Sequence, residues 1–99
     1  MFIIELTYKK SLAEADTYLQ GHRDFLDRYY EQGLFLASGP KHPREGGVIL
    51  AQGEREHIEA IVKEDPFYQQ GIADYRIIEL VVRKACAELS FLLAPDTAT

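Results

Sequence analysis

The order of apolar segments along the chain limits its fold more than any other feature. Four segments have the β-branched and aromatic composition of strands: residues 2–8, 34–38, 46–52 and 75–82. In two others, residues 11–32 and 54–64, apolar side chains recur every three or four positions, as on one face of a helix. The sequence therefore predicts the order strand, helix, strand, strand, helix, strand.

Two helices can cover only one face of a four-stranded sheet. The segments 2–8 and 75–82 are nevertheless apolar on both faces, so the second face needs a cover. We therefore expect an α+β protein: a ferredoxin-like βαββαβ sandwich with a four-stranded antiparallel sheet, pairing sheet to sheet as a homodimer. A small ligand cavity between the sheets is an alternative use of the same surface.

The chain is long enough for one domain and too short for two. We assign residues 1–83 to that domain and residues 84–99 to a C-terminal extension. Its apolar side chains are Leu89, Phe91, Leu92 and Leu93. Because such a segment is too apolar for free solution, we expect it to be partly docked, either on its own domain or on the dimer partner.

Composition narrows the choice of partners. Sixteen acidic and eleven basic residues give a net charge of −5, and no basic stripe is present, which argues against nucleic acid as a partner. The single cysteine, Cys86, forms no internal disulfide, and the first residues do not resemble an export signal. No apolar run is long enough to cross a membrane. These features favour a cytoplasmic protein without membrane contact.

His22 interrupts an otherwise apolar helix face. The residues spaced along this face are Leu12, Ala15, Leu19, His22, Leu26 and Tyr29. An imidazole can take or give a proton near neutral pH, so a half-buried one is a candidate acid or base. The alternative is a core histidine whose nitrogens bond to the backbone.

Asp65 is the second polar residue on an inward face, since it follows Ile61 and Val62 at helical spacing. A carboxylate at a helix C-terminus opposes the helix dipole, so another interaction should compensate it, and an imidazole would serve. Asp65 can equally cap a short following turn that has Pro66 in its first position. The sequence leaves both roles open.

Other chemistry is less well supported. His42 and His57 lie on different segments from His22 without a paired spacing, so no metal and no cofactor are expected. No motif for covalent catalysis surrounds the serines or Cys86. Glycines near residues 39 and 46 allow close backbone approach to a ligand, or simply form a hairpin. The aromatic residues Phe35, Phe67 and Tyr68 can wall a pocket, or be core.

Several short motifs together resemble the YciI family over residues 1–82. They are His22, Ser38-Gly39-Pro40, Gly46-Gly47, Asp65-Pro66-Phe67 and Gln70-Gly71. The resemblance implies a dimeric α+β barrel of ferredoxin-like subunits, with a proposed histidine and aspartate active site that maps onto His22 and Asp65. A few members of the family are tied to the breakdown of chlorinated aromatic compounds. The segment after Arg83 departs from the usual end of the family.

The leading hypothesis is a small enzyme in which Asp65 orients His22 for acid/base chemistry on a small organic substrate, by isomerisation, elimination or hydrolysis. Its expected substrate-binding residues are Ser38, Gly39, Pro40, Phe35, Phe67 and Tyr68. The alternative is a non-catalytic dimeric module that binds a small ligand or serves an accessory role. A cofactor-free monooxygenase is a third, less favoured hypothesis.

Overall fold

The computed structural model describes residues 1–95 and contains one four-stranded sheet in the order β2-β3-β1-β4. Its strands are β1 (Phe2–Tyr8), β2 (Phe35–Pro40), β3 (Gly46–Ala51) and β4 (Ala73–Glu79). Each neighbouring pair is antiparallel. The chain connects them as the sequence predicts, so the ferredoxin-like α+β class is confirmed.

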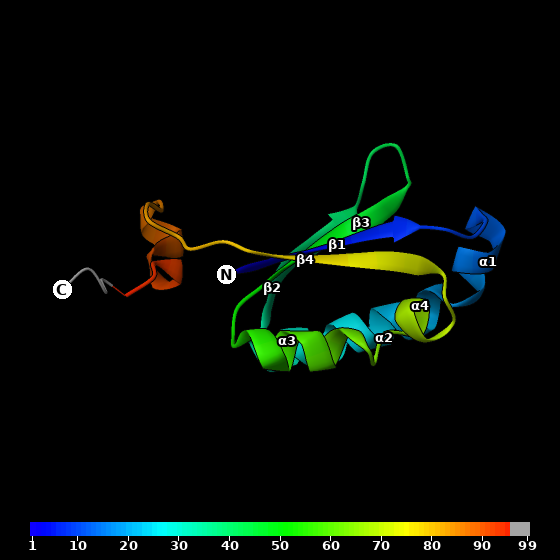
Figure 1. Ribbon diagram of the computed structural model, residues 1–99, viewed down its shortest axis with the longest axis horizontal. Coiled ribbons are helices and arrows are strands. Elements are labelled where there is room, and N and C mark those ends of the chain that lie inside the picture. The colour runs from blue at the N-terminus through cyan, green and yellow to red at the C-terminus, as the bar shows by residue number, and fades with distance from the viewer. Residues whose placement is uncertain (96–99) are drawn as a thin grey trace.

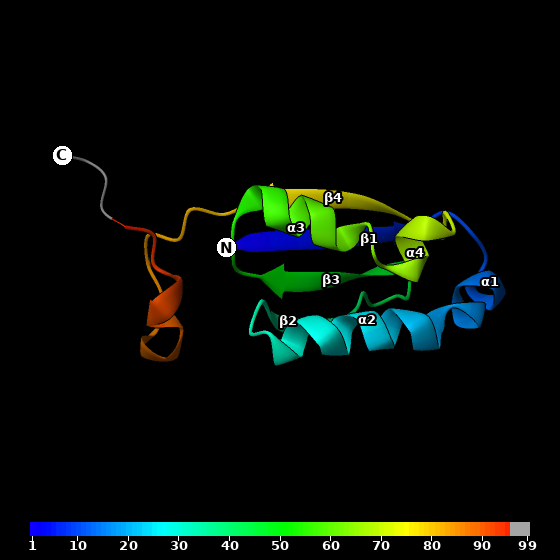
Figure 2. The same cartoon turned by 90° about the horizontal axis from the view of Figure 1, so that it is seen from below.

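Four helices accompany the sheet: α1 (Leu12–Thr17), α2 (Leu19–Glu31), α3 (Arg55–Val62) and α4 (Pro66–Gln69). Helices α2, α3 and α4 lie on the same side of the sheet, and α2 runs alongside β2 (Figures 1 and 2). The core lies between these layers, where Ile4, Phe25, Ile49 and Ile58 are almost completely buried. No helix or strand lies over the opposite face of the sheet within residues 1–95 (Figure 1).

The single helix predicted for residues 11–32 is instead two helices that meet at Tyr18. Its backbone has φ −106° and ψ 7°, outside the helical region. The Thr17 hydroxyl donates to the carbonyl of Ala13 at 3.2 Å, a contact that bends helices. Both expected ends are present: the Ser11 side chain caps α1 by accepting from the Glu14 amide, and Gly33 follows α2 with φ +73°.

The last strand starts and ends earlier than the predicted 75–82. Pairing with β1 determines both limits, because Tyr8 lies opposite Ala73 and Phe2 lies opposite Glu79. Beyond Glu79 only Met1 remains as a neighbour on β1, and its carbonyl accepts from the amide of Leu80. The apolar run in the sequence therefore extends past the end of the sheet.

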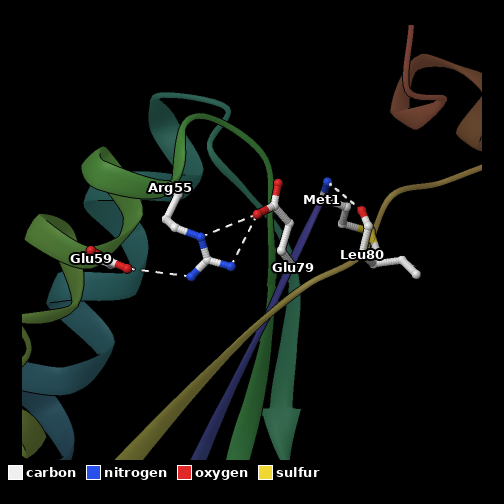
Figure 3. Close-up of polar contacts among 5 residues, drawn as sticks. All are labelled: Met1, Arg55, Glu59, Glu79 and Leu80. Atoms are coloured by element: carbon white, nitrogen blue, oxygen red, sulfur yellow. Dashed lines mark hydrogen bonds and ion pairs between the residues drawn. The ribbon is translucent and has the colours of Figure 1, made fainter. Parts of the chain in front are cut away.

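Polar contacts fasten this end of the sheet (Figure 3). The guanidinium of Arg55 on α3 lies 3.1 Å from Glu79 of β4 and 3.5 Å from Glu59. The N-terminal ammonium donates to the carbonyl of Leu80 at 3.2 Å. The chain then leaves the sheet in an extended segment (Figure 1).

The extension carries a short 3₁₀ helix, Ala87–Leu92, beyond the end of the sheet (Figure 1). The amide of Ala94 donates to the carbonyl of Val82, so the chain after the 3₁₀ helix returns to the start of the extension. Leu89, Phe91 and Leu93 remain 46, 57 and 43% exposed. The predicted docking of residues 84–99 remains a prediction, and residues 96–99 lie outside the described part of the chain.

At the end of the β2–β3 connection, the backbone of Gly46 passes very close to the backbone of β1. Gly46 has φ +147°, and a Cβ there would lie 1.8 Å from the carbonyl oxygen of Leu6. Only glycine fits this position, because any side chain would overlap the neighbouring strand. Gly46 thereby fixes the start of β3, beside the cavity described below.

Candidate active site

His22 and Asp65 meet although 43 positions separate them. The Nδ1 atom of His22, on α2, lies 2.9 Å from Oδ1 and 2.8 Å from Oδ2 of Asp65, which precedes α4. Asp65 is completely buried, whereas the His22 side chain is 13% exposed. The expectation that these two inward side chains approach each other is therefore confirmed as geometry.

The carboxylate of Asp65 accepts hydrogen bonds from three directions. Its Oδ1 accepts from the amide of Phe67 at 2.9 Å, which caps α4 with Pro66 in the first helical position. Its Oδ2 accepts from the hydroxyl of Tyr75 on β4. The capping role and the contact with His22 thus occur together, and neither alternative from the sequence excludes the other.

Tyr75 is a part of the site that the sequence analysis did not identify. Burial, then the charge of Asp65 and the hydrogen bond to it, raise the pKa of the Tyr75 hydroxyl above its ordinary value. The hydroxyl therefore keeps its proton and remains a donor to the carboxylate. The only signal in the sequence was a polar tip within an apolar strand, which a buried tyrosine commonly satisfies with a partner.

A close contact between α2 and α4 brings the pair together. A Cβ added at Gly21 would lie 3.0 Å from the ring of Pro66, so the missing side chain allows this approach. The imidazole of His22 stacks on Phe67, with ring centroids 4.2 Å apart and planes 7° from parallel. The stacking contact with Phe67 therefore positions the plane of the imidazole, and the hydrogen bond to Asp65 positions its Nδ1 atom.

His22 forms part of the wall of a cavity of about 520 Å³ between α2 and the β2–β3 side of the sheet. Its apolar lining includes Leu6, Leu19, Leu26, Val48, Ile49 and Phe67. Pockets of this size and composition are typical for small organic ligands. Since Nδ1 is bonded to Asp65, Nε2 is the ring nitrogen left for a ligand, and no residue within 1–95 bonds to it.

The polar interruption on the predicted helix face now has a structural explanation. Leu19, His22 and Leu26 line the cavity, and the buried residues of α2 are Phe25 and Tyr29. Two other residues of the predicted face, Ala15 and Tyr29, are buried in the core, whereas Leu12 is 46% exposed. Helix α2 contributes apolar side chains both to the cavity lining and to the core, so its apolar surface is wider than one stripe.

The residues predicted to bind substrate divide into two groups. Ser38, Gly39, Pro40 and Phe67 line the cavity. Phe35 is buried in the core with its ring 5.6 Å from that of Phe25, outside the lining. Tyr68 is 44% exposed on α4 and also outside it. The roles of all these residues in binding remain predictions.

Residues 1–95 contain no group of three or more His, Cys, Asp or Glu side chains placed to hold a metal ion. In that same part of the chain, none of the helices combines the length and apolarity needed to cross a membrane.

Replacing Tyr75 by phenylalanine is expected to lower the free energy of unfolding by about 1–3 kcal/mol, because the buried Asp65 carboxylate loses a donor. Tyr29→Phe is the matched control. Its hydroxyl donates to Glu64, whose side chain is 48% exposed, so water can replace that bond. Urea denaturation of both variants measures the difference. Equal losses would contradict a special role for the Tyr75 hydroxyl.

The fold and the site together define a ferredoxin-like α+β domain with an internal histidine–aspartate pair beside a cavity of about 520 Å³. The YCII-related domain model matches residues 1–81. The chain therefore belongs to the YCII-related domain family.

The solved structures that share this fold include 5-chloro-2-hydroxyhydroquinone dehydrochlorinase (TftG) from Burkholderia phenoliruptrix AC1100, in complex with 2,5-dihydroxybenzoquinone. Its TM-score is 0.67 at 14% sequence identity, and the match covers 81% of this chain and 93% of that one. At this identity the similarity concerns the fold. No curated protein matches the chain in sequence.

Proposed function

We propose that this protein is a small enzyme in which His22 transfers protons to and from a small organic substrate. The observation that carries the proposal is the position of the His22 side chain. It is hydrogen-bonded through Nδ1 to the buried carboxylate of Asp65, and it also lines the cavity. A carboxylate on one nitrogen fixes the tautomer of the neutral imidazole, which leaves the other nitrogen as a base.

In the proposed reaction, Nε2 of His22 accepts a proton from the substrate. The positive charge that forms on the ring is stabilised by Asp65, which is held by the Phe67 amide and the Tyr75 hydroxyl. The protonated ring then returns the proton at a second position or to a leaving group. General acid/base catalysis of this kind accelerates reactions by about 10²–10⁴-fold.

Family membership and the structural neighbour support this class of function. The neighbour is a dehydrochlorinase by name, and its complex shows that this fold can hold a small cyclic ligand. The cavity beside His22 has a suitable volume of about 520 Å³ for a ligand of that kind. Elimination, isomerisation and hydrolysis can each use a positioned base of this type.

The proposal is tested by nuclear magnetic resonance in deuterated water. The wild-type protein is incubated with a panel of small cyclic acids, enols and their chlorinated derivatives, including 5-chloro-2-hydroxyhydroquinone. We expect exchange or turnover of at least one compound by the wild type, and its loss in His22→Ala. A substrate converted equally well by both proteins would overturn the assignment of His22.

A non-catalytic ligand-binding module is the second candidate, favoured by the same cavity. It is distinguished by the same panel, because a ligand would raise the melting temperature by mass action without being changed. In either case we propose residues 1–83 as the functional domain. The location proposed for this function is the cytoplasm, consistent with Cys86 being an unpaired thiol.

We also propose that two copies pair through the sheet face opposite the helices. An apolar row crosses three strands there, since Ile3 lies opposite Leu50 on one side and opposite Ile78 on the other. All three are half-buried in the single chain. A stable pairing of these faces should bury more than about 1,000 Å² in total.

Sedimentation at micromolar concentration is expected to show a dimer for the wild type and a monomer for Ile3→Glu. The added charge would lie in the middle of the apolar row, where pairing would bury it without a partner. Ala60→Glu is the control, because it adds the same charge to the exposed side of α3. A wild-type monomer would contradict the proposed interface.

A further inference from the structure

The charged side chains that line the cavity are all cationic, although the chain as a whole is acidic. Its net charge is −5, yet within residues 1–95 no Asp or Glu belongs to the cavity lining. The cations are Arg23, Lys41 and Arg44. A cleft lined by one sign of charge raises the local concentration of ligands that carry the opposite sign.

Two of these cations already have carboxylate partners. The guanidinium of Arg44 lies 2.6 Å from Asp16, and the ammonium of Lys41 lies 3.4 Å from Glu5. No ion pair involves Arg23 among the described residues. Arg23 is therefore the cavity cation whose charge is left for a ligand.

Arg23 is also close in sequence to the proposed base. It follows His22 directly on α2, and both side chains line the same cavity. The lining also includes apolar side chains from the helix-covered face of the sheet, Leu6 and Ile49. The cavity thus offers a cation, a base and an apolar surface for a hydrocarbon body.

We propose that the ligand of this cavity is a compact, largely apolar organic anion whose charged oxygens bind Arg23. The shared chemistry is that of a carboxylate, phenolate or enolate, each of which offers oxygens to the planar guanidinium. This inference rests on the proposed function, because it places the reacting part of the anion at His22. Removal of a proton by His22 adds negative charge to the substrate, which a neighbouring cation stabilises.

The test compares anions with neutral molecules of similar shape. Benzoate is matched with benzamide, and 4-nitrophenolate with 4-nitroanisole, in titrations followed by the amide resonances of α2. We expect at least one anion to bind about tenfold more tightly than its neutral counterpart, as a charge-assisted contact would provide. A preference in the first pair assigns a carboxylate, and a preference in the second assigns a phenolate-like oxygen.

Arg23→Gln is expected to abolish this preference. Arg28→Gln is the matched control, because Arg28 is on the same helix, pairs with Glu64 at 3.5 Å and lies outside the cavity lining. Equal binding of anions and neutral molecules by the wild type would overturn the inference. A preference that survives in Arg23→Gln would overturn it as well.

The same variants separate this inference from the proposed function. His22→Ala should retain the preference for anions, since Arg23 is unchanged. A retained preference without any proton transfer by the wild type would contradict only the proposed function. Turnover that requires His22, with the same KM for an anionic substrate in wild type and Arg23→Gln, would contradict only the role of Arg23.

Discussion

Replacing His22 by alanine is expected to reduce turnover by about 10²–10⁴-fold while the protein still folds. The variant removes the ring nitrogen that faces the cavity. Asp65 keeps its bonds from the Phe67 amide and the Tyr75 hydroxyl, so its buried carboxylate is not left without donors. We therefore expect His22→Ala to lower kcat strongly and the free energy of unfolding only slightly.

The control for this experiment is His57→Ala. His57 is an exposed histidine on α3 outside the cavity lining, so its removal should leave turnover unchanged. Kinetics and thermal denaturation are measured on both variants with the substrate identified from the panel. Full turnover by His22→Ala would end the assignment of His22 as the base.

Two substitutions of Asp65 are expected to separate its chemical role from its structural role. Alanine leaves the Phe67 amide, the Tyr75 hydroxyl and the His22 Nδ1–H without their acceptor. The free energy of unfolding should fall by about 3–5 kcal/mol, because several buried donors lose their partner at once. For a domain of this size, such a loss lowers the melting temperature by more than about 10 °C.

Asparagine should be milder for stability and severe for activity. It remains a good helix cap and keeps one carbonyl oxygen for the Phe67 amide. Its amide group can donate to Nδ1 of His22, which moves the proton of the neutral imidazole to Nε2 and removes the base from the cavity. We expect turnover to fall by about 10²–10⁴-fold with a loss of only about 1–2 kcal/mol in stability.

The tautomer can be measured directly. Nitrogen-15 spectra of His22 should show a proton on Nδ1 in the wild type and on Nε2 in Asp65→Asn. A variant that unfolds easily but retains full activity would mean that Asp65 serves only as the cap of α4. Such a result would contradict the catalytic interpretation of the pair.

The local patterns of the sequence predicted elements well because each pattern spans only a few residues. Ser11 and Gly33 mark helix ends through their own backbone and side-chain geometry. The limits of β4 were not predicted, because they depend on where β1 begins and ends. The break at Tyr18 was also missed, since the periodic pattern on both sides of it is continuous.

The sequence by itself determined the order of the elements, the ferredoxin-like class and the two unusual polar residues, His22 and Asp65. Periodicity and capping are properties of short segments, so one chain is enough to predict them. Only the tertiary structure decided the distance at which these two side chains meet, that Tyr75 donates to the same carboxylate and that Arg23, beside the cavity, forms no ion pair within residues 1–95. Those contacts join segments far apart in the chain, and the packing of α2 and α4 against the sheet creates them.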